Sequence, residues 1–373
     1  MLKIDRLLIK NFDWATFSLV IFLSIVGIMT IYSATRPLLP HEQPTYHIRQ
    51  FYWLLIGISS LFLVVSFDYI WLSRFATPLY VTGIVLLLAV LIAGKTGMGA
   101  QRWLNIGPVS FQPSEFFRLI FIIFIAGYFM TIHRRMDLIT ALKSFLMFTF
   151  APLIILLKQP DLGTAIILLL MFLFISLAKG LQKKLIALLI ILGIISIPFI
   201  GNIFWEGLKD YQKNRLIAFM EPDADPAGIG YHINQSKVAI GSGGFFGKGY
   251  LHGTQGPFRF LPEKQTDFIF AVFAEEWGLF GSVLLLLVYL ALILRGFDTA
   301  LKAKDEFGRL LAAGITFMFS TYFFINVGMT LGIMPVVGIP LPFMSYGGTA
   351  LLSNFIAAGI LINIRTRRYE LFY

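Results

Sequence analysis

The sequence contains no cysteine, and this absence excludes several kinds of chemistry at once. Without thiols there is no disulfide framework, no thiolate nucleophile and no cysteine-bound zinc. Charged residues are also scarce, at 13% of the 373 residues, whereas 57% are hydrophobic. That composition excludes a soluble enzyme, a collagen-like chain and a disordered tail. Any chemistry must therefore come from the carboxylates, amines, hydroxyls or five histidines of a membrane protein.

Long apolar runs are what the sequence has in abundance. A run of about 17 to 25 apolar residues can cross a hydrocarbon core of about 30 Å as a helix. Ten such runs predict an all-α polytopic membrane protein with ten transmembrane helices, forming one integral membrane domain over residues 1–373. We place them near 14–34, 50–67, 75–93, 113–132, 141–157, 164–179, 184–204, 268–294, 310–333 and 345–364.

The distribution of lysine and arginine predicts the orientation of these helices. Lys3, Arg6 and Lys10 precede a first apolar run that is too long for the core of a signal peptide, so this run is expected to be an anchor. If the N-terminus is cytoplasmic, most basic residues of the short loops also lie on the cytoplasmic side, as membrane insertion favours. Both termini are then cytoplasmic, and one long loop, about 202–266, is extracytoplasmic between helices 7 and 8. This loop is itself basic, which indicates an acidic ligand.

Glu115 and Arg118 are the first candidate functional residues, because ionisable groups inside a bilayer cost several kcal/mol. They follow Pro113 at the predicted start of the fourth helix, and their i, i+3 spacing allows them to form an ion pair. The pair either contributes to a substrate site or only neutralises itself.

Asp267 lies where the basic loop meets the eighth predicted helix. Thr266 or Asp267 could simply be the N-cap of that helix. Alternatively, the helix N-terminus and nearby cations would keep the Asp267 carboxylate ionised, as a base that accepts a proton from a sugar hydroxyl requires. Glu275 and Glu276 lie deeper along the same helix, where structural pairing is the favoured interpretation.

Other candidates have equally plausible structural roles. Asp161 could form an Asx-type turn, and Arg49 at the head of the second helix could extend to the membrane interface, or either could contact a phosphate or hydroxyl. The glycine-rich stretch 241–249 is not a P-loop, because Ser242 and Gly249 occupy positions where that motif needs Gly and Ser or Thr. It is either a flexible hinge or a place where the backbone approaches an anion or sugar.

Taken together, these segments resemble the SEDS family of bacterial cell-wall polymerases. The resemblance covers nearly the whole chain, and 274–278 and 334–342 resemble the elongation type more than the division type. The matching motifs are Gln101–Leu104, Gln112–Glu115, Gln159–Thr164, Gly230–Lys237, Ala239–Gly244, Gly247–Gly249, His252–Gln255, Thr266–Ala271 and Ser345–Gly348.

The resemblance implies a peptidoglycan glycosyltransferase of the bacterial cytoplasmic (inner) membrane. It would polymerise lipid II into β-1,4-linked glycan strands at the outer face during cell elongation, by inverting displacement of undecaprenyl pyrophosphate. Asp267 matches the family's essential carboxylate and is the expected catalytic base. The expected substrate-binding residues comprise three cations for the pyrophosphate and three residues of a polar cavity: Arg49, Arg102 and Lys248, and Glu115, Arg118 and Asp161.

Two positions depart from the family pattern. Arg118 stands where a lysine is common, which keeps the charge but excludes a proton carrier there, and Gln265 replaces a frequent histidine, so a catalytic imidazole is not required.

The expected partners are lipid II, a class B penicillin-binding protein with transpeptidase activity and other membrane proteins of the elongation complex, and no nucleic acid. No metal ligands stand out, although a divalent cation such as magnesium or manganese could bridge pyrophosphate and a carboxylate. Two alternatives stay open at this point: a lipid II flippase, and a non-catalytic scaffold for the penicillin-binding protein.

Overall fold

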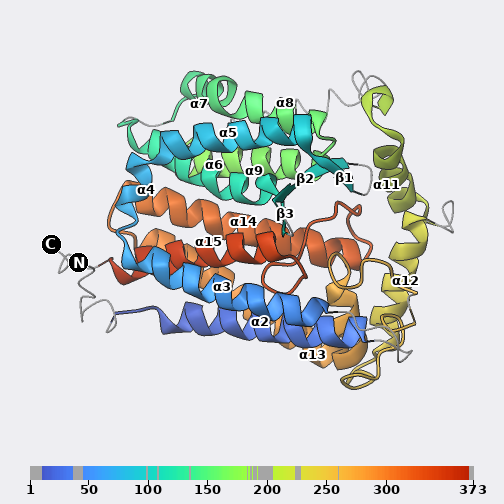
Figure 1. The fold of residues 1–373 in the computed structure, drawn as a ribbon. Helices are drawn as coiled ribbons and strands as arrows, with labels where there is room; N and C mark the ends of the chain where they lie inside the picture. Colours follow the sequence, from blue (N-terminus) through green and yellow to red (C-terminus); the bar gives the residue numbers. More distant parts are fainter. Residues whose placement is uncertain are drawn as a thin grey trace. The chain divides into compact units, whose positions relative to one another are not determined.

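The computed structural model describes residues 11–36, 45–97, 100–106, 109–133, 136–182, 184, 187, 191, 205–222, 228–258 and 260–368. Its elements carry the labels of Figure 1. They are α2 (Trp14–Thr35), α3 (Tyr46–Ser66), α4 (Ile70–Arg74), α5 (Ala76–Ala93), β1 (Lys95–Gly97), β2 (Ala100–Ile106), β3 (Val109–Phe111), α6 (Pro113–Met130), α7 (Leu138–Ser144), the π-helical segment η1 (Phe145–Thr149), α8 (Phe150–Lys158), α9 (Leu162–Ala178), α11 (Asp210–Met220), α12 (Ile229–Ser242), α13 (Ile269–Leu301), α14 (Glu306–Thr330) and α15 (Gly348–Thr366).

The all-α polytopic fold is confirmed. Within the described residues, eight helical segments are long and apolar enough to cross a membrane, and α9 is a shorter apolar helix of 17 residues. These nine segments coincide with nine of the predicted spans, and the seventh predicted span, near 184–204, falls almost entirely outside the described residues. The loop predicted over 202–266 contains the helices α11 and α12.

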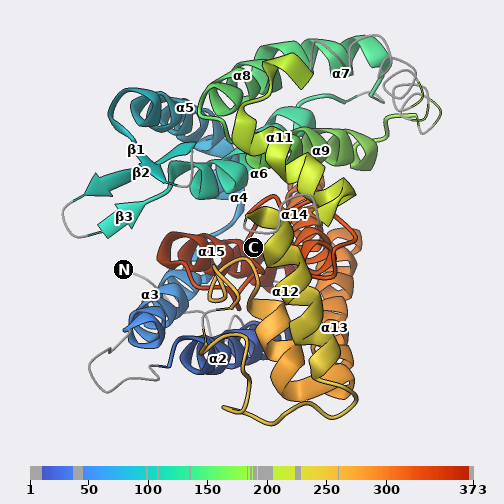
Figure 2. The same ribbon diagram turned by 90° about the vertical axis from the view of Figure 1, so that its right-hand side faces the viewer.

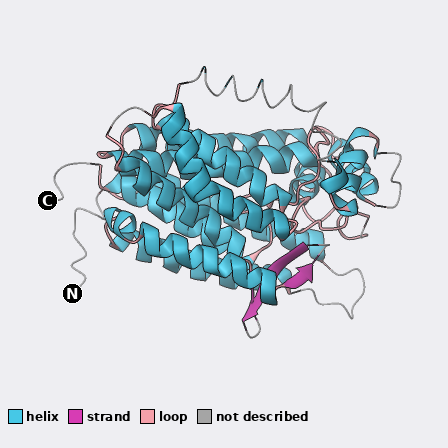
Figure 3. Ribbon diagram, turned by 90° about the horizontal axis from the view of Figure 1, so that it is seen from above, coloured by secondary structure: helices cyan, strands magenta, loops and turns pink. Residues whose placement is uncertain are grey.

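A small antiparallel sheet, drawn in magenta in Figure 3, was not predicted from the sequence. Its strand order is β1-β2-β3, with Lys95 opposite Trp103 and Leu104 opposite Phe111. Two of the strands have only three residues, so they are too short for an apolar-run count to detect. The sheet carries Arg102 on its central strand.

The chain divides into two compact units, one formed by Met1–Trp71 with Ala218–Tyr373 and the other by Leu72–Ile217. In the first unit α3 and α15 run side by side (Figure 1). Glycines allow this approach, because a Cβ on Gly359 would lie 3.2 Å from Leu61 Cα and one on Gly57 would clash with the Phe355 ring at 2.7 Å. Such small-residue contacts are typical of helix pairs in membranes.

A buried cluster in the first unit joins α12 to α13 and α14, and Figure 2 shows α12 lying along α13. Phe268, at 1% exposure, belongs to this cluster and is the N-cap of α13. The start of α13 is therefore anchored in a packed apolar core. The members are Ala34, Ile233, Ala239, Leu261, Phe268, Ala271, Val272, Met329 and Val336.

In the second unit α5 packs against α6. Tyr80 stacks on Phe124 with ring centroids 4.1 Å apart, and its hydroxyl donates to the Phe148 carbonyl at 2.6 Å. Gly83 makes room for the Phe117 ring, which a Cβ would approach to 2.8 Å. This packing holds the N-terminal end of α6, where Glu115 and Arg118 lie.

The helix α13 is interrupted at Gly278, whose φ of 66° and ψ of −165° are not helical. The segment 244–249 lies along the interruption and makes main-chain hydrogen bonds that the broken helix cannot make. A backbone polar group left unpaired within a membrane costs several kcal/mol, so this pairing makes the interruption possible. The bonds are Lys248 N to Glu275 O, Gly249 N to Glu276 O, Leu279 N to Gly244 O and Phe280 N to Phe245 O.

Candidate active site

Asp267 lies in the turn 261–268, immediately before the N-cap of α13, and its side chain is half-buried. The N-cap is Phe268 and no side chain caps the helix, so the interpretation of Thr266 or Asp267 as the cap is wrong. The Thr266 hydroxyl instead donates to Glu263 Oε2 at 3.0 Å. The structure thus places a partly exposed acidic residue just before the N-terminus of a helix.

The main chain around Asp267 is fixed from outside the turn. Three successive carbonyl oxygens each accept a hydrogen bond from a residue much later in the sequence. The bonds are Tyr346 N–H to Gln265 O at 2.8 Å, Ser345 Oγ–H to Thr266 O at 2.7 Å and Asn326 Nδ2–H to Asp267 O at 3.0 Å.

Sequence reasoning missed Asn326 and did not assign a role to Ser345. The available signals were an amide inside the apolar run of α14 and a serine inside the motif Ser345–Gly348. Polar side chains within a membrane helix usually bond another segment.

Glu275 is fully buried beside the interruption of α13, and its carboxylate accepts several hydrogen bonds from protein groups. Its Oε1 accepts from Lys248 Nζ at 2.6 Å and from the Thr254 amide and hydroxyl at 2.8 and 2.7 Å, and its Oε2 accepts from the Gln255 amide at 3.1 Å. The predicted structural pairing of Glu275 is confirmed. Lys248, expected to contact pyrophosphate, therefore has its charge already balanced.

Glu276 is also buried, and its Oε1 accepts a hydrogen bond from the Ser33 hydroxyl of α2. Burial, with Glu276 and Tyr32 nearby, raises the pKa of Tyr250, so this phenol stays protonated near the Glu276 carboxyl. The glycine-rich loop therefore packs on the two glutamates. The loop is packed closely at Gly247, where a Cβ would lie 2.1 Å from the Glu276 carbonyl oxygen. Such close packing does not support the interpretation of the loop as a flexible hinge.

The second unit holds a separate polar quartet, made of Arg102, Glu115, Arg118 and Asp161. Arg118 donates to Glu115 Oε1 at 2.5 Å, which confirms the predicted i, i+3 pair. Arg102 lies 3.3 Å from Asp161 Oδ1 and also donates to the Pro160 carbonyl at 3.2 Å. With two cations and two carboxylates, the quartet is electrically neutral.

Asp161 has a local role as well. It is the N-cap of α9, where its side chain accepts from the Thr164 amide at 3.2 Å and from the Thr164 hydroxyl at 2.8 Å. The Asx-type turn, one of the two roles that the sequence allowed for Asp161, is thus a helix cap. Glu115, Arg118 and Asp161 are each at most 5% exposed, so their charges are turned toward one another and away from solvent.

Arg49 differs from the other predicted cations. It lies in the first turn of α3, its side chain is exposed, and it forms no ion pair with any residue in the part of the chain that the structure describes. Its neighbour Gln50 is buried and donates to the Ser345 carbonyl at 3.1 Å, in the same loop that binds the Asp267 turn. Arg49 therefore offers a positive charge next to that loop with no ion-pair partner among the described residues.

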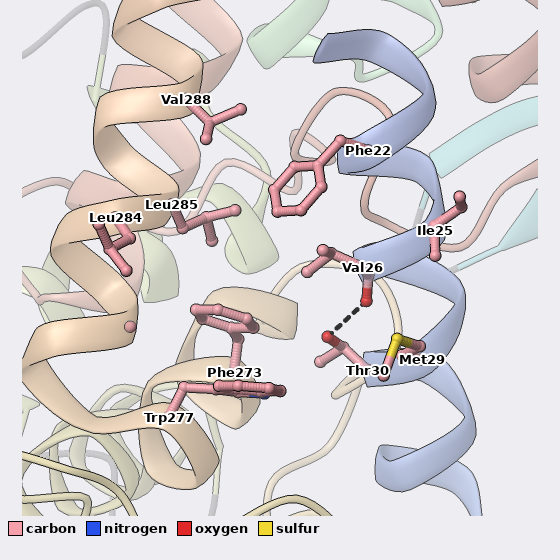
Figure 4. Close-up of a pocket in the computed structure, with 11 residues that line it drawn as sticks. Phe22, Ile25, Val26, Met29, Thr30, Phe273, Trp277, Leu284, Leu285 and Val288 are labelled. Carbon is pink, nitrogen blue, oxygen red and sulfur yellow. Dashed lines mark hydrogen bonds between the residues drawn. The ribbon is translucent and has the colours of Figure 1, made fainter. Parts of the chain in front are cut away.

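An apolar cavity of about 360 Å³ lies between α2 and α13 (Figure 4). Phe273 and Trp277 stack at its floor with their centroids 5.9 Å apart, and the hydroxyl of Thr30 is already bonded to the Val26 carbonyl. No predicted site residue lines this cavity. It is a hydrophobic chamber and offers no group for acid–base chemistry.

Comparison with known proteins gives a consistent result. The family model FTSW_RODA_SPOVE, described as cell cycle protein, matches residues 10–370. The peptidoglycan glycosyltransferase MrdB of Escherichia coli (strain K12) is 45% identical over 297 residues, which are 79% of this chain and 78% of MrdB. The peptidoglycan glycosyltransferase RodA of Treponema pallidum is 31% identical and covers 96% of this chain and 99% of its own.

Solved structures agree with these relatives. A chain from a peptidoglycan synthase complex, described as coordinating polymerization and crosslinking, superposes with a TM-score of 0.83 at 29% identity over 96% of this chain and 99% of its own. The crystal structure of the rod shape determining protein RodA of Thermus thermophilus gives a TM-score of 0.71 at 28% identity, covering 96% and 98% of the two chains. This protein therefore belongs to the FtsW/RodA/SpoVE family, and within it is a RodA-type SEDS protein.

Proposed function

We propose that Asp267 is the general base of this chain, which is a peptidoglycan glycosyltransferase of the bacterial inner membrane. The proposed substrates are two molecules of lipid II. The 4-hydroxyl oxygen of one attacks the anomeric carbon of the sugar that is α-linked to undecaprenyl pyrophosphate in the other. Asp267 takes the hydroxyl proton, the pyrophosphate leaves with the bonding electron pair, and a β-1,4 bond forms with inversion.

The observation that carries this proposal is the partial exposure of Asp267 compared with the four other carboxylates that the sequence analysis singled out. Glu115, Asp161, Glu275 and Glu276 are at most 5% exposed and are engaged with the cations, hydroxyls or amides described above. A general base must come within about 3 Å of the proton that it removes. Of these five carboxylates, only Asp267 combines partial exposure with a helix N-terminus.

The leaving pyrophosphate needs positive charge, and Arg49 is the proposed first contact because this arginine is exposed and forms no ion pair within the described part of the chain. A guanidinium can bind a phosphate through two parallel hydrogen bonds. Arg102 and Lys248 remain proposed contacts, with Glu115, Arg118 and Asp161 as polar neighbours of the substrate path. Because these five residues already balance one another or Glu275, we expect them to contribute less binding energy than Arg49.

We also propose finer features of the topology and of the place of the reaction. They are a single membrane domain over 1–373, ten spans with both termini in the cytoplasm, and chemistry at the outer face of the membrane. The likeness to a chain of a synthase complex supports a penicillin-binding protein as partner, and we propose one of class B, acting with other membrane proteins of the elongation complex.

A divalent cation also remains a proposal. Among the described residues, no three histidine or carboxylate side chains converge to hold a metal ion. A magnesium or manganese ion would therefore need most of its ligands from pyrophosphate oxygens and water.

The test is glycan polymerisation from purified lipid II by the protein co-purified with its penicillin-binding partner. Wild type and Asp267→Asn are compared at equal amounts of recovered complex, and transfer of labelled lipid II across vesicles is followed in parallel. The proposal predicts polymer from wild type and none from Asp267→Asn. Polymer from both would remove Asp267 from the chemistry, and lipid II transfer without polymer from either would favour a flippase.

A further inference from the structure

The placement of Asp267 depends on contacts outside its own turn. Within the turn, the Thr266 and Phe268 amides both donate to the Glu263 carbonyl, at 3.1 and 3.3 Å. Helix α13 begins only at Ile269, so the regular helical ladder does not hold the backbone of residue 267. Three hydrogen bonds, from Asn326, Ser345 and Tyr346, tie the main chain of residues 265–267 to later segments of the unit.

Asn326 is fully buried on α14 and joins two segments through one amide group. Its Nδ2 donates to the Asp267 carbonyl at 3.0 Å and to the Ile339 carbonyl at 2.8 Å. Because both neighbours are acceptors, the amide must present its nitrogen to them. Its Oδ1 then has no hydrogen-bond partner among the described residues.

That unpartnered oxygen is informative. A buried acceptor without a donor destabilises a protein by about 1 to 3 kcal/mol. The cost of this unpartnered oxygen therefore offsets part of the stability that the two donated bonds of Asn326 supply. A polar group that contributes little net stability but fixes two main-chain segments has the properties of a positioning residue.

Ser345 provides the second contact and is only 5% exposed. Its hydroxyl accepts from the Leu341 amide at 2.8 Å and donates to the Thr266 carbonyl at 2.7 Å, so both directions of the hydroxyl are used. The loop that carries Ser345 is itself fixed, because Gln50 donates to the Ser345 carbonyl and accepts from the Gly347 amide, and Tyr289 donates to Pro342.

We propose that Asn326 and Ser345 are positioning residues that set the place of the Asp267 carboxylate by binding the main-chain oxygens of residues 266 and 267. This inference rests on the proposed role of Asp267 as the base. A shift of about 1 Å in a reacting group can lower a rate about 100-fold, so loss of these contacts should act on catalysis more than on substrate binding.

The chain supplies a matched control in Asn363. This residue is 1% exposed on α15, and its Nδ2 also donates to two main-chain carbonyls, those of Val64 at 2.8 Å and Phe67 at 2.6 Å. Asn363 lies 15 positions after Gly348, which is about 22 Å along α15 at 1.5 Å per residue, whereas Ser345 precedes that helix. Asn363→Leu removes two donated bonds of the same kind as Asn326→Leu, but away from Asp267, and it also removes the bond that Asn363 Oδ1 accepts from Arg367 Nε at 2.8 Å.

The experiment measures kcat and KM for lipid II polymerisation per folded complex in Asn326→Leu, Asn363→Leu, Ser345→Ala and Ser345→Thr. Hydrogen–deuterium exchange of residues 263–268 is measured on the same samples. We expect Asn326→Leu to lower kcat about 100-fold with KM within about threefold of wild type, and to speed exchange over 263–268. Asn363→Leu should leave both unchanged, and Ser345→Thr, which keeps the hydroxyl, should retain more activity than Ser345→Ala.

Two results would overturn the inference. One is equal kcat for Asn326→Leu and Asn363→Leu, and the other is unchanged exchange over 263–268 in Asn326→Leu. Failure of the proposed function gives a different pattern, because Asp267→Asn in the same assay would then polymerise at the wild-type rate whatever the behaviour of Asn326→Leu.

Discussion

The two units of the chain hold their functional candidates in different ways. In the second unit, Glu115, Arg118 and Asp161 are buried and Arg102 is half-buried, and the four side chains form two ion pairs that hold them in place. In the first unit, the turn with Asp267 is held through its main-chain oxygens, and the carboxylate keeps partial exposure.

This difference indicates that the quartet mainly stabilises the fold, whereas Asp267 is available for a reaction. A carboxylate that is buried in an ion pair is fixed by its partner, and releasing it costs several kcal/mol. A carboxylate whose backbone is fixed instead can exchange its side-chain contacts for a substrate at lower cost. The quartet is thus suited to support structure and shape a polar site, and Asp267 is suited to accept a proton.

The largest expected effect comes from breaking the quartet. Glu115→Gln leaves Arg118 buried without its counter-charge, and the loss of one partner of a buried pair destabilises by about 3 to 5 kcal/mol. The measurement is the unfolding midpoint of the purified protein in detergent. The double variant Glu115→Leu with Arg118→Met removes both charges and should recover most of the loss. A single variant as stable as wild type would contradict the account of the quartet.

The interruption of α13 is the corresponding weak point in the first unit. Gly278→Ala places a side chain on a backbone with φ of 66°, and its Cβ would lie 2.2 Å from the Gly247 amide nitrogen. We expect the free energy of unfolding to fall by about 3 kcal/mol, the upper end of the range for a strained backbone position. The unfolding midpoint in detergent measures this loss. Gly207→Ala, where a Cβ meets nothing within 4 Å, is the control, and equal losses in both variants would argue against the strain.

A smaller effect is expected from Arg49, because it supplies charge without holding structure. Arg49→Gln should lower kcat/KM for lipid II polymerisation about tenfold, mainly through KM, which corresponds to about 1.4 kcal/mol of binding. Added salt should weaken wild-type binding and narrow the difference. Arg309→Gln, at an exposed arginine already paired with Glu306 at 3.0 Å, should change neither constant. Identical behaviour of the two variants would exclude Arg49 as a substrate contact.

The smallest effect distinguishes the two roles of Asp161. Asp161→Asn keeps an N-cap acceptor for α9 but removes the charge that faces Arg102, whereas Asp161→Ala removes both. The alanine variant should be less stable than the asparagine variant by about 1 kcal/mol. Equal midpoints would show that the cap adds nothing beyond the ion pair.

The features that the sequence predicted are those encoded over short distances. Apolar runs predicted helices such as α2 and α5, because length and composition alone decide whether a helix can span a bilayer. The Glu115–Arg118 pair followed from i, i+3 spacing on one helix.

The features that the sequence did not predict depend on distant partners. At the interruption of α13, Gly278 packs against Gly247, which lies 31 positions earlier in the sequence. The apolar run of α13 continues past Gly278, so hydrophobicity alone does not reveal the interruption. Asn326 likewise acts on Asp267, 59 positions earlier, and only its polarity within α14 marked it. Helical spacing contains no information about such contacts.

One comparison tests the central claim most directly. Lipid II polymerisation is measured per folded complex for two substitutions that each turn a carboxylate into an amide, Asp267→Asn and Asp161→Asn. If Asp267 is the base, its variant loses about 100-fold to 10,000-fold in kcat while staying folded, and the Asp161 variant loses far less. If Asp267→Asn keeps wild-type kcat, the accessible carboxylate before α13 does not accept the proton and the account is wrong.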